Sequence, residues 1–412
     1  MPRFLSLAAA LLLGLQLIAC SKSPVPATEP QIESTAEQAQ RIAKTSIIVD
    51  THIDLPMRLA VVNSDITKEQ SRYDFDYPKA LAGGLNVPFM SVYTAAELEA
   101  EGKSKEKAEQ IIAIVEDIEE RWPDKFRIAR STADVREQFA AGLMSLPMGM
   151  ENGAPIEGDL ENIQYFYDRG IRYITLAHSL SNHLSDSSYD DERKWNGLSP
   201  LGKQAVTEMN RLGIMVDVSH LSDEAFWQVL ELTTAPVIAS HSSARHFTPG
   251  AERNMNDEMI KALAENGGVI QINFGSYFIT QEAREYGSAL SKAAKIYQAD
   301  HPEATSTFIY TEYPAIYAAE NGAYPYADLD DVLDHFDHVV SLVGVDHVGI
   351  GSDYEGVGDS LPDGIKNVAG YPNLIAGLLG RGYSEDDIRK ILGENLLRVW
   401  RQVEEHAAAA AT

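Results

Sequence analysis

Cysteine is almost absent from this chain of 412 residues, because Cys20 is the only one. A disulfide framework and a cysteine-rich zinc site are therefore excluded, and any bound metal must be held by histidines and carboxylates. Basic residues are also scarce, with 34 Lys and Arg against 61 Asp and Glu, which gives a net charge of −27. So negative a surface repels phosphate backbones, and we expect no nucleic-acid partner.

Two common hydrolase motifs are missing as well. The sequence has no Gly-x-Ser-x-Gly segment, the turn that presents the nucleophile of many serine hydrolases, although Ser240 and Ser242 flank His241. It also has no His-Glu-x-x-His segment, which helical metalloproteases use to hold zinc. With 44% hydrophobic and 23% charged residues, the composition is nevertheless that of a globular protein with a full core.

Residues 1–20 have the layout of a secretory signal peptide, with one basic residue, an apolar run and a small residue before Cys20. The segment Leu17–Cys20 resembles the bacterial lipobox, in which the cysteine is lipidated; the alternative is an ordinary signal peptide with a chance cysteine. Lipidation is favoured because the one cysteine lies where the motif requires it. Ser21 rather than an aspartate follows, so we expect a lipid-anchored protein of the bacterial cell envelope, on the outer membrane facing the periplasm. Residues 21–38, rich in Ser, Pro, Glu and Thr, are predicted to form a flexible tether.

From about residue 45 onward, short apolar runs alternate with helical patterns, as in repeated βα units. The spacing predicts eight strands, and eight parallel strands close a (β/α)8 TIM barrel of the α/β class. The predicted strands are 47–55, 85–93, 145–152, 172–178, 214–220, 236–242, 268–274 and 347–353. We assign residues 39–401 to this catalytic domain and 402–412 to an Ala-rich tail.

Between the predicted strands, apolar residues recur at helical spacing over 105–120 and 201–212. Ser199 and Pro200 are typical of a helix N-cap followed by proline at the first helical position. The stretch 276–328 is too long for a simple connection, and we expect an inserted helical excursion over the barrel mouth.

Polar side chains lie where a doubly covered parallel strand should be apolar, at the predicted strand ends. These residues are His52, Asp54, Glu151, His178, His220, His241 and Asp353. Any one such histidine is more often a hydrogen-bonded residue than a ligand, and a lone carboxylate can cap the next helix. The group is stronger evidence than its members, because the C-terminal strand ends of a TIM barrel meet at one mouth.

A catalytic zinc centre needs neutral imidazoles and carboxylate oxygens, with one position left open for water. If Glu151 gives one oxygen to each of two ions, His52 and Asp54 complete the first site, and His220 and His241 complete the second. A shared hydroxide would fill the remaining position as a nucleophile. The other histidines lie in predicted loops or helices or at a strand start, and are not expected to be ligands: His183, His246, His301, His335, His338, His347 and His406.

Several segments resemble the membrane dipeptidase (renal dipeptidase) family in order and spacing, from about residue 45 to Arg398. They are Asp50–Pro56, Met148–Gly153, Arg172–His178, Asn196–Pro200, Val216–His220, Ala235–Ala244 and Gly349–Val357. The resemblance implies a binuclear Zn²⁺ dipeptidase in which Glu151 bridges the ions. It also implies a metal-dependent amidohydrolase-like barrel, dipeptide substrates and a homodimer, whereas attachment to the membrane is expected from the N-terminal lipobox.

The same resemblance implies a role for three further residues. His178 would bind the substrate and stabilise the developing oxyanion, and Arg253 would hold the terminal carboxylate of the substrate. Asp353 would bind substrate and move protons between the nucleophilic water and the leaving amine. From the residues alone, Arg253 reads as a surface arginine at a helix start, whereas Asp353 has glycines nearby that permit close approach.

The loop 179–186 differs from the Trp-containing version of the animal enzymes, which leaves the side-chain preference open. One alternative is a related binuclear amidohydrolase acting on another amide or a lactone. The metal-bridging lysine of those relatives has no counterpart on the predicted fourth strand, which favours a dipeptidase. A second alternative is a lipoprotein that binds small ligands without catalysis, and the complete ligand set argues against it.

Overall fold

The computed structural model describes residue 1 and residues 33–410. The predicted signal peptide, the lipidation site Cys20 and most of the predicted tether lie outside the described residues. The compact unit begins at Thr35, where helix α1 starts inside the stretch predicted as a tether. Its first turn is polar, so only the buried Ala39, Ile42 and Ala43 mark it as part of the domain.

Eight parallel strands form a closed barrel in the order β1-β10-β9-β8-β7-β6-β5-β2, which confirms the predicted TIM barrel. The strands are β1 (Val49–Ile53), β2 (Val87–Tyr93), β5 (Met148–Glu151), β6 (Ile171–Thr175), β7 (Met215–Asp217), β8 (Ile238–Ala239), β9 (Val269–Ile272) and β10 (Val348–Ile350). Each lies within or within one residue of its predicted range. Outside the barrel, β3 (Phe126–Arg127) pairs with β4 (Met144–Ser145).

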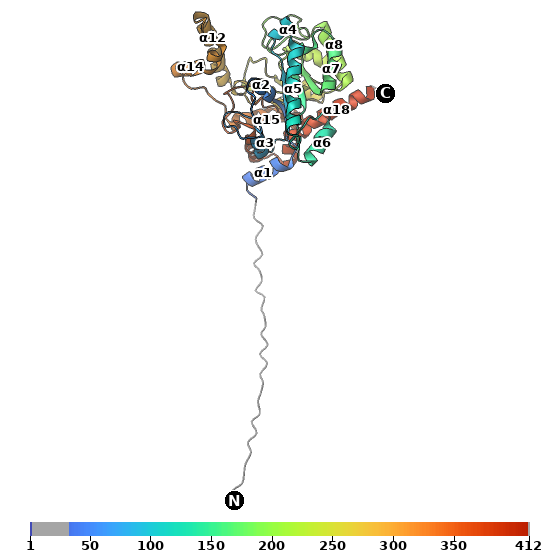
Figure 1. The fold of residues 1–412 in the computed structure, drawn as a ribbon, viewed down its shortest axis with the longest axis vertical. Coiled ribbons are helices and arrows are strands. Elements are labelled where there is room, and N and C mark those ends of the chain that lie inside the picture. Colours follow the sequence, from blue (N-terminus) through green and yellow to red (C-terminus); the bar gives the residue numbers. More distant parts are fainter. Residues whose placement is uncertain (2–32, 411–412) are drawn as a thin grey trace. The chain divides into compact units, whose positions relative to one another are not determined.

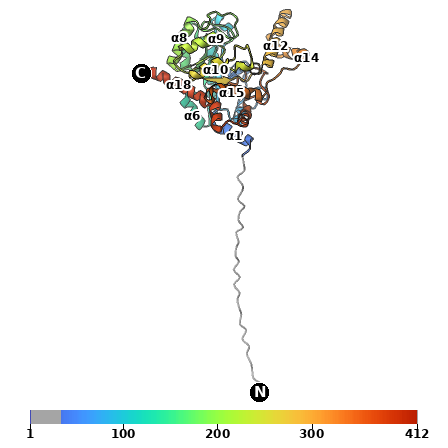
Figure 2. The ribbon, with the colours of Figure 1, turned by 180° about the vertical axis from the view of Figure 1, so that it is seen from behind.

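Helices surround the barrel, with α5 and α7 on the side seen in Figure 1 and α9 and α10 on the side seen in Figure 2. The longer ones are α1 (Thr35–Thr45), α5 (Ser104–Arg121), α6 (Thr132–Ala140), α7 (Glu161–Arg169), α8 (Pro200–Leu212), α9 (Asp223–Leu232), α10 (Asp257–Glu265), α12 (Gln281–Asp300), α14 (Tyr313–Asn321), α15 (Leu329–Val343), α16 (Tyr371–Gly380) and α18 (Asn395–Ala410). The shorter ones are α2 (Leu55–Val61), α3 (Tyr77–Gly83), α4 (Glu97–Glu101), α11 (Ser276–Ile279), α13 (Ser306–Thr311), α17 (Glu385–Arg389), the π-helical turn η5 (Lys390–Glu394), and the 3₁₀ turns η1 (Ala154–Ile156), η2 (Arg245–Phe247), η3 (Val345–His347) and η4 (Val368–Gly370).

The two helices expected from apolar spacing are confirmed as α5 and α8. The N-cap of α8 also forms as expected, because the Ser199 side chain accepts a hydrogen bond from the Gly202 amide and Pro200 opens the helix. The predicted Ala-rich tail instead continues α18 as far as Ala410. At the N-terminal end of the barrel, Trp400 of α18 packs against Phe89 of β2 and closes the core.

The long insertion forms helices α11 to α14, and α12 and α14 stand out from the barrel in both views (Figures 1 and 2). Only its ends, through Tyr277, Phe278 and Tyr324, line the barrel mouth. The expected excursion is therefore present, but most of it projects away from the mouth. Among the described residues, no helix combines the length and apolar character needed to cross a membrane.

Candidate metal centre at the barrel mouth

The structure brings the predicted strand-end residues together at the C-terminal end of the barrel. His52 is the last residue but one of β1, Glu151 is the last residue of β5, and Asp54 follows β1 directly. The others follow strand ends by two or three residues: His178 after β6, His220 after β7, His241 after β8 and Asp353 after β10. Three overlapping groups of possible ligands result, namely His52–Glu151–His241, Glu151–His178–His220 and His52–Asp54–Asp353.

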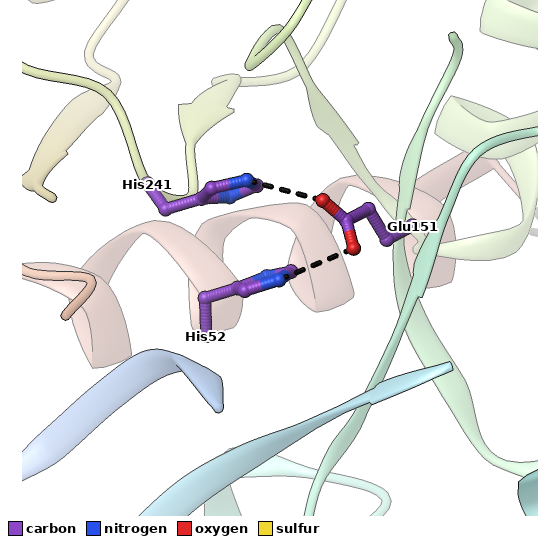
Figure 3. Close-up of side chains that lie close together, drawn as sticks. All are labelled: His52, Glu151 and His241. Carbon is purple, nitrogen blue, oxygen red and sulfur yellow. Dashed lines mark ion pairs between the residues drawn. The ribbon is translucent and has the colours of Figure 1, made fainter. Parts of the chain in front are cut away.

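The two oxygens of the Glu151 carboxylate face different imidazoles. Its Oε2 atom is 3.4 Å from Nε2 of His52, whereas Oε1 is 3.2 Å from Nε2 of His220 and 3.3 Å from Nε2 of His241. Figure 3 shows the carboxylate beside the stacked rings of His52 and His241, with one oxygen directed to each ring. Asp54 lies on the His52 side, with its Oδ2 atom 3.6 Å from His52 Nε2. The arrangement offers one Glu151 oxygen to each of two ligand pairs.

The nitrogen atoms of this cluster suit a cation. Nε2 of His52 is buried and has no hydrogen-bond partner, although two carboxylates lie close to it. Nε2 of His220 and Nε2 of His241 face each other at 2.8 Å. Buried acceptors without donors are costly, and neutral imidazoles with carboxylates are the ligands that Zn²⁺ prefers. The residues present therefore fit a pair of divalent ions.

Two of the histidines are fixed in the tautomer that a metal ligand needs. The Tyr173 hydroxyl donates to the Thr51 carbonyl oxygen at 3.0 Å, so Nδ1–H of His52 donates to that hydroxyl at 2.9 Å and Nε2 keeps its lone pair. In the same way His241 Nδ1 is 2.7 Å from the Ser240 hydroxyl, which is 2.6 Å from the Asp217 carboxylate. Neither Tyr173 nor Asp217 was expected from the sequence to serve the site.

The charge states follow from burial and from the neighbouring groups. Burial acts to raise the pKa of Glu151, but the surrounding imidazoles hold it well below its ordinary value, so the carboxylate is ionised. Burial lowers the pKa of His220 and of His241 well below the ordinary value, which keeps both rings neutral. Burial also raises the pKa of Asp353 to about 8, aided by the nearby Asp54 and Glu151 carboxylates.

Arg253 lies beside the cluster rather than on the surface. Its side chain donates to the Ser242 hydroxyl and the His241 carbonyl oxygen, each at 2.7 Å, and it lies 3.0 Å from Nε2 of His220. Its Nε atom is buried and has no hydrogen-bond partner, and none of the ion pairs between described residues involves it. A buried guanidinium without a carboxylate partner can receive a carboxylate ligand, so the surface interpretation of Arg253 does not hold.

Two of the residues that follow strand ends have an unusual backbone conformation. His220 and Asp353 adopt left-handed conformations, with φ of 68° and 65°, which residues other than glycine seldom adopt. Such conformations cluster at functional sites, where the surrounding structure holds them. A Cβ atom on Gly356 would lie 2.3 Å from carboxylate oxygens of both Asp353 and Asp54, so this position needs glycine to let the two acids approach.

A cavity of about 800 Å³ opens over the cluster. Its lining includes Asp54, Glu151, His178, His220 and Asp353 of the strand ends. Four tyrosines complete much of the wall, namely Tyr93, Tyr189, Tyr277 and Tyr324. Asp353 is oriented there by Asn273, whose amide donates to its Oδ2 atom at 2.8 Å. The cavity has room for a small ligand next to the candidate metal ligands.

A model of the membrane dipeptidase family (peptidase family M19) matches residues 36–412. The chain belongs to this family. Dipeptidase tcpJ of Claviceps purpurea (strain 20.1) is 33% identical over 300 residues, which make up 73% of this chain and 60% of that relative. The family member described here thus spans less than two thirds of the length of that curated relative.

Solved structures of bacterial proteins share the fold along almost their whole length. The probable dipeptidase PvdM from Pseudomonas aeruginosa has a TM-score of 0.80 and 28% identity, covering 90% of this chain and 99% of that one. A metallo peptidase from Rhodobacter sphaeroides, liganded with a phosphinate mimic of the dipeptide L-Ala-D-Ala, has a TM-score of 0.71 and 26% identity, covering 87% and 99%. Both matches agree with the family assignment.

Proposed function

We propose that this protein is a metal-dependent dipeptidase that hydrolyses dipeptides at the barrel mouth. The observation that carries the proposal is the Glu151 carboxylate, in which one oxygen faces His52 and the other faces His220 and His241. Family membership supports the same activity, as does the dipeptide mimic bound by the relative from Rhodobacter sphaeroides.

The cofactor in this proposal is a pair of Zn²⁺ ions. His52 and Asp54 would hold one ion and His220 and His241 the other, with Glu151 giving an oxygen to each. When bound, the two ions supply Lewis acidity, which ionises water at neutral pH and polarises the peptide carbonyl. Tyr173 and Ser240 keep the ligand nitrogens of His52 and His241 free of protons, because they accept from the opposite nitrogen of each ring.

Arg253 would bind the terminal carboxylate of the dipeptide. Its guanidinium is fixed by Ser242 and the His241 carbonyl, so the carboxylate is held at one distance from the cluster. A fixed distance leaves room for a single residue after the scissile bond, which accounts for a preference for dipeptides over longer chains. An arginine on a flexible segment would not impose such a limit.

Two further residues act on the reacting groups in this proposal. His178 lies on the cavity wall with Nε2 3.4 Å from Glu151 Oε1, where it can donate to the carbonyl oxygen of the scissile bond as negative charge develops there. Asp353 lines the same cavity and is oriented by Asn273, so it can take a proton from water and give it to the leaving amine.

The proposal is tested with the full chain purified in detergent. We expect zinc-loaded protein to hydrolyse L,L- or L,D-dipeptides but not tripeptides or dipeptides with an amidated C-terminus. A chelator should abolish the activity and added Zn²⁺ should restore it. Glu151→Gln removes the charge at nearly the same volume and should lose both bound metal and activity. The assignment would be contradicted if Glu151→Gln were as active as the parent. It would also be contradicted if the protein hydrolysed lactones or other amides but no dipeptide.

We also propose that Cys20 anchors the protein in the bacterial cell envelope by a lipid, as the lipobox resemblance suggests. Cys20→Ser should move the protein from the membrane fraction to the soluble fraction and abolish labelling with a radioactive fatty acid. Equal membrane retention of parent and variant would contradict a lipid anchor. The family resemblance also implies a homodimer. Sedimentation equilibrium of Cys20→Ser without detergent should then give twice the mass of one chain.

A further inference from the structure

A second group of metal-binding side chains lies outside the barrel mouth. His246 belongs to the turn η2, Asp257 is the first residue of α10, and His338 belongs to α15. One possible ligand atom of each lies within 4.8 Å of the other two. Of the four such groups among the described residues, this is the one that contains no residue of the mouth cluster.

The contacts within this group already bring the ligands together. Nε2 of His338 is 2.8 Å from the Asp257 carboxylate, and the rings of His246 and His338 stack with their centroids 4.4 Å apart. Phe247 also packs edge-on against His338, with ring centroids 5.6 Å apart. His246 is exposed, so its ring can turn to direct a nitrogen toward the other two ligands while water completes the coordination.

Two imidazoles and a carboxylate are a ligand set for Zn²⁺ and neighbouring divalent ions of the first transition series. A stacked histidine pair with one ion-paired aspartate would otherwise serve only as a surface contact. Two features favour a cation. The two rings bring two basic nitrogens close together with no proton donor between them. The net charge of −27 also attracts cations to the protein.

The position of the group gives a bound ion a mechanical effect. His246 and Asp257 lie at the two ends of the segment 247–256, which carries Arg253. Hydrogen bonds already hold this segment to its surroundings, among them Arg245 N–H to Met255 O at 2.8 Å and those from Arg253 to Ser242 and the His241 carbonyl oxygen. An ion shared by His246, Asp257 and His338 would tie both ends of the segment to α15.

We infer that His246, Asp257 and His338 form a peripheral site for a Zn²⁺-class divalent ion, which cross-links the Arg253 segment to α15. None of the three residues lines the cavity over the mouth cluster, so this site is separate from the proposed catalytic centre. The inference does not depend on the proposed dipeptidase activity, because it concerns an ion held by other residues.

The test compares zinc content and zinc affinity in the full chain and in two variants, His246→Asn and His338→Asn. His301→Asn is the matched control, because His301 is another histidine whose ring stacks on a neighbouring ring, that of Tyr297, but it lies outside the group. After saturation with Zn²⁺ and removal of free ion, we expect each variant to hold one equivalent fewer per chain than the parent and the control. In calorimetric titration with Zn²⁺, the corresponding step should be at least tenfold weaker in both variants.

Amide hydrogen exchange provides the second measurement. Exchange in segment 247–256 should slow when the parent takes up this equivalent, and the variants should show no such change. Equal zinc content in parent and His246→Asn would overturn the site, and because His246 is exposed, its replacement leaves the buried core unchanged. Uptake of the extra equivalent without slower exchange would overturn the cross-link. Because the mouth ligands are intact in every variant, these results are separable from failure of the catalytic proposal.

Discussion

Replacing Tyr173 by phenylalanine should weaken metal binding at the barrel mouth while leaving the barrel folded. The Tyr173 hydroxyl is buried, accepts from Nδ1–H of His52 and donates to the Thr51 carbonyl oxygen. Phenylalanine keeps the ring, which fills the space left by Gly149, where a Cβ atom would lie 1.9 Å from the Tyr173 ring. The change therefore removes two hydrogen bonds and little packing.

The magnitude follows from the groups left without partners. Without the hydroxyl, His52 no longer prefers the tautomer with a free Nε2, and the Thr51 carbonyl is left buried without that donor. An unsatisfied buried group costs about 1–3 kcal/mol, and loss of a partner behind a ligand histidine lowers metal affinity by about 10–100-fold. We therefore expect Zn²⁺ affinity to fall by about that factor, measured by competition with a chromophoric chelator.

The matched control is Tyr354→Phe. The Tyr354 hydroxyl is also buried and donates to backbone oxygens, those of Ile365 and Asn367, but it has no contact with the histidines. Both variants should lose a similar amount of stability to unfolding, and only Tyr173→Phe should lose metal affinity. If Tyr173→Phe binds Zn²⁺ as tightly as the parent, the hydroxyl does not position His52 as a ligand.

Three other changes test separate parts of the structure. Arg253→Ala should raise KM for dipeptides on the order of 100-fold, and Arg253→Lys clearly less; equal effects would remove its role in binding the carboxylate. Asp353→Asn should lower kcat at least about 100-fold with unchanged zinc content, and loss of zinc would instead make Asp353 a ligand. Burial lowers the pKa of His335 to about 4, so the unfolded chain binds more protons between pH 6.5 and 4, and stability falls as pH falls through this range. Denaturant titrations at pH 7.5 and 4.5 give the free energy of unfolding at each pH. The decrease between them should be about 2–3 kcal/mol smaller for His335→Gln than for the parent, and equal decreases would refute this.

The barrel was predictable because eight apolar runs alternate with helical patterns, and six of these runs end in a charged or imidazole side chain. The predicted strands 172–178 and 214–220 were nevertheless too long, since β6 ends at Thr175 and β7 at Asp217. The sequence places His178 and His220 next to the apolar runs, but it does not show where strand pairing stops. In the structure these histidines lie on the segments that follow the strands, and His220 has a left-handed backbone conformation there.

Arg253 was the residue least supported by its own sequence context, because nothing local distinguishes it from an exposed arginine. Its burial depends on Ser242 and His241, which follow β8, and on Phe278 from the start of the insertion, whose ring centroid is 5.5 Å from the guanidinium carbon. A partner that arrives from a distant segment leaves no periodic signal near the residue itself. For such a position, resemblance to a family is more informative than the local pattern.

The residues behind the ligands were missed for a related physical reason. Tyr173 lies in β6 opposite Gly149 of β5, and the tyrosine ring reaches His52 only because glycine leaves the barrel interior open at that level. An aromatic residue in a strand and a glycine in its neighbour each have ordinary explanations, and only the register between the two strands joins them. The chemistry of the mouth thus depends on side-chain volume one layer below it. A substitution at Gly149, which contacts no candidate ligand, should disturb the centre by displacing Tyr173, and a metal site of this kind is built from the barrel core upward.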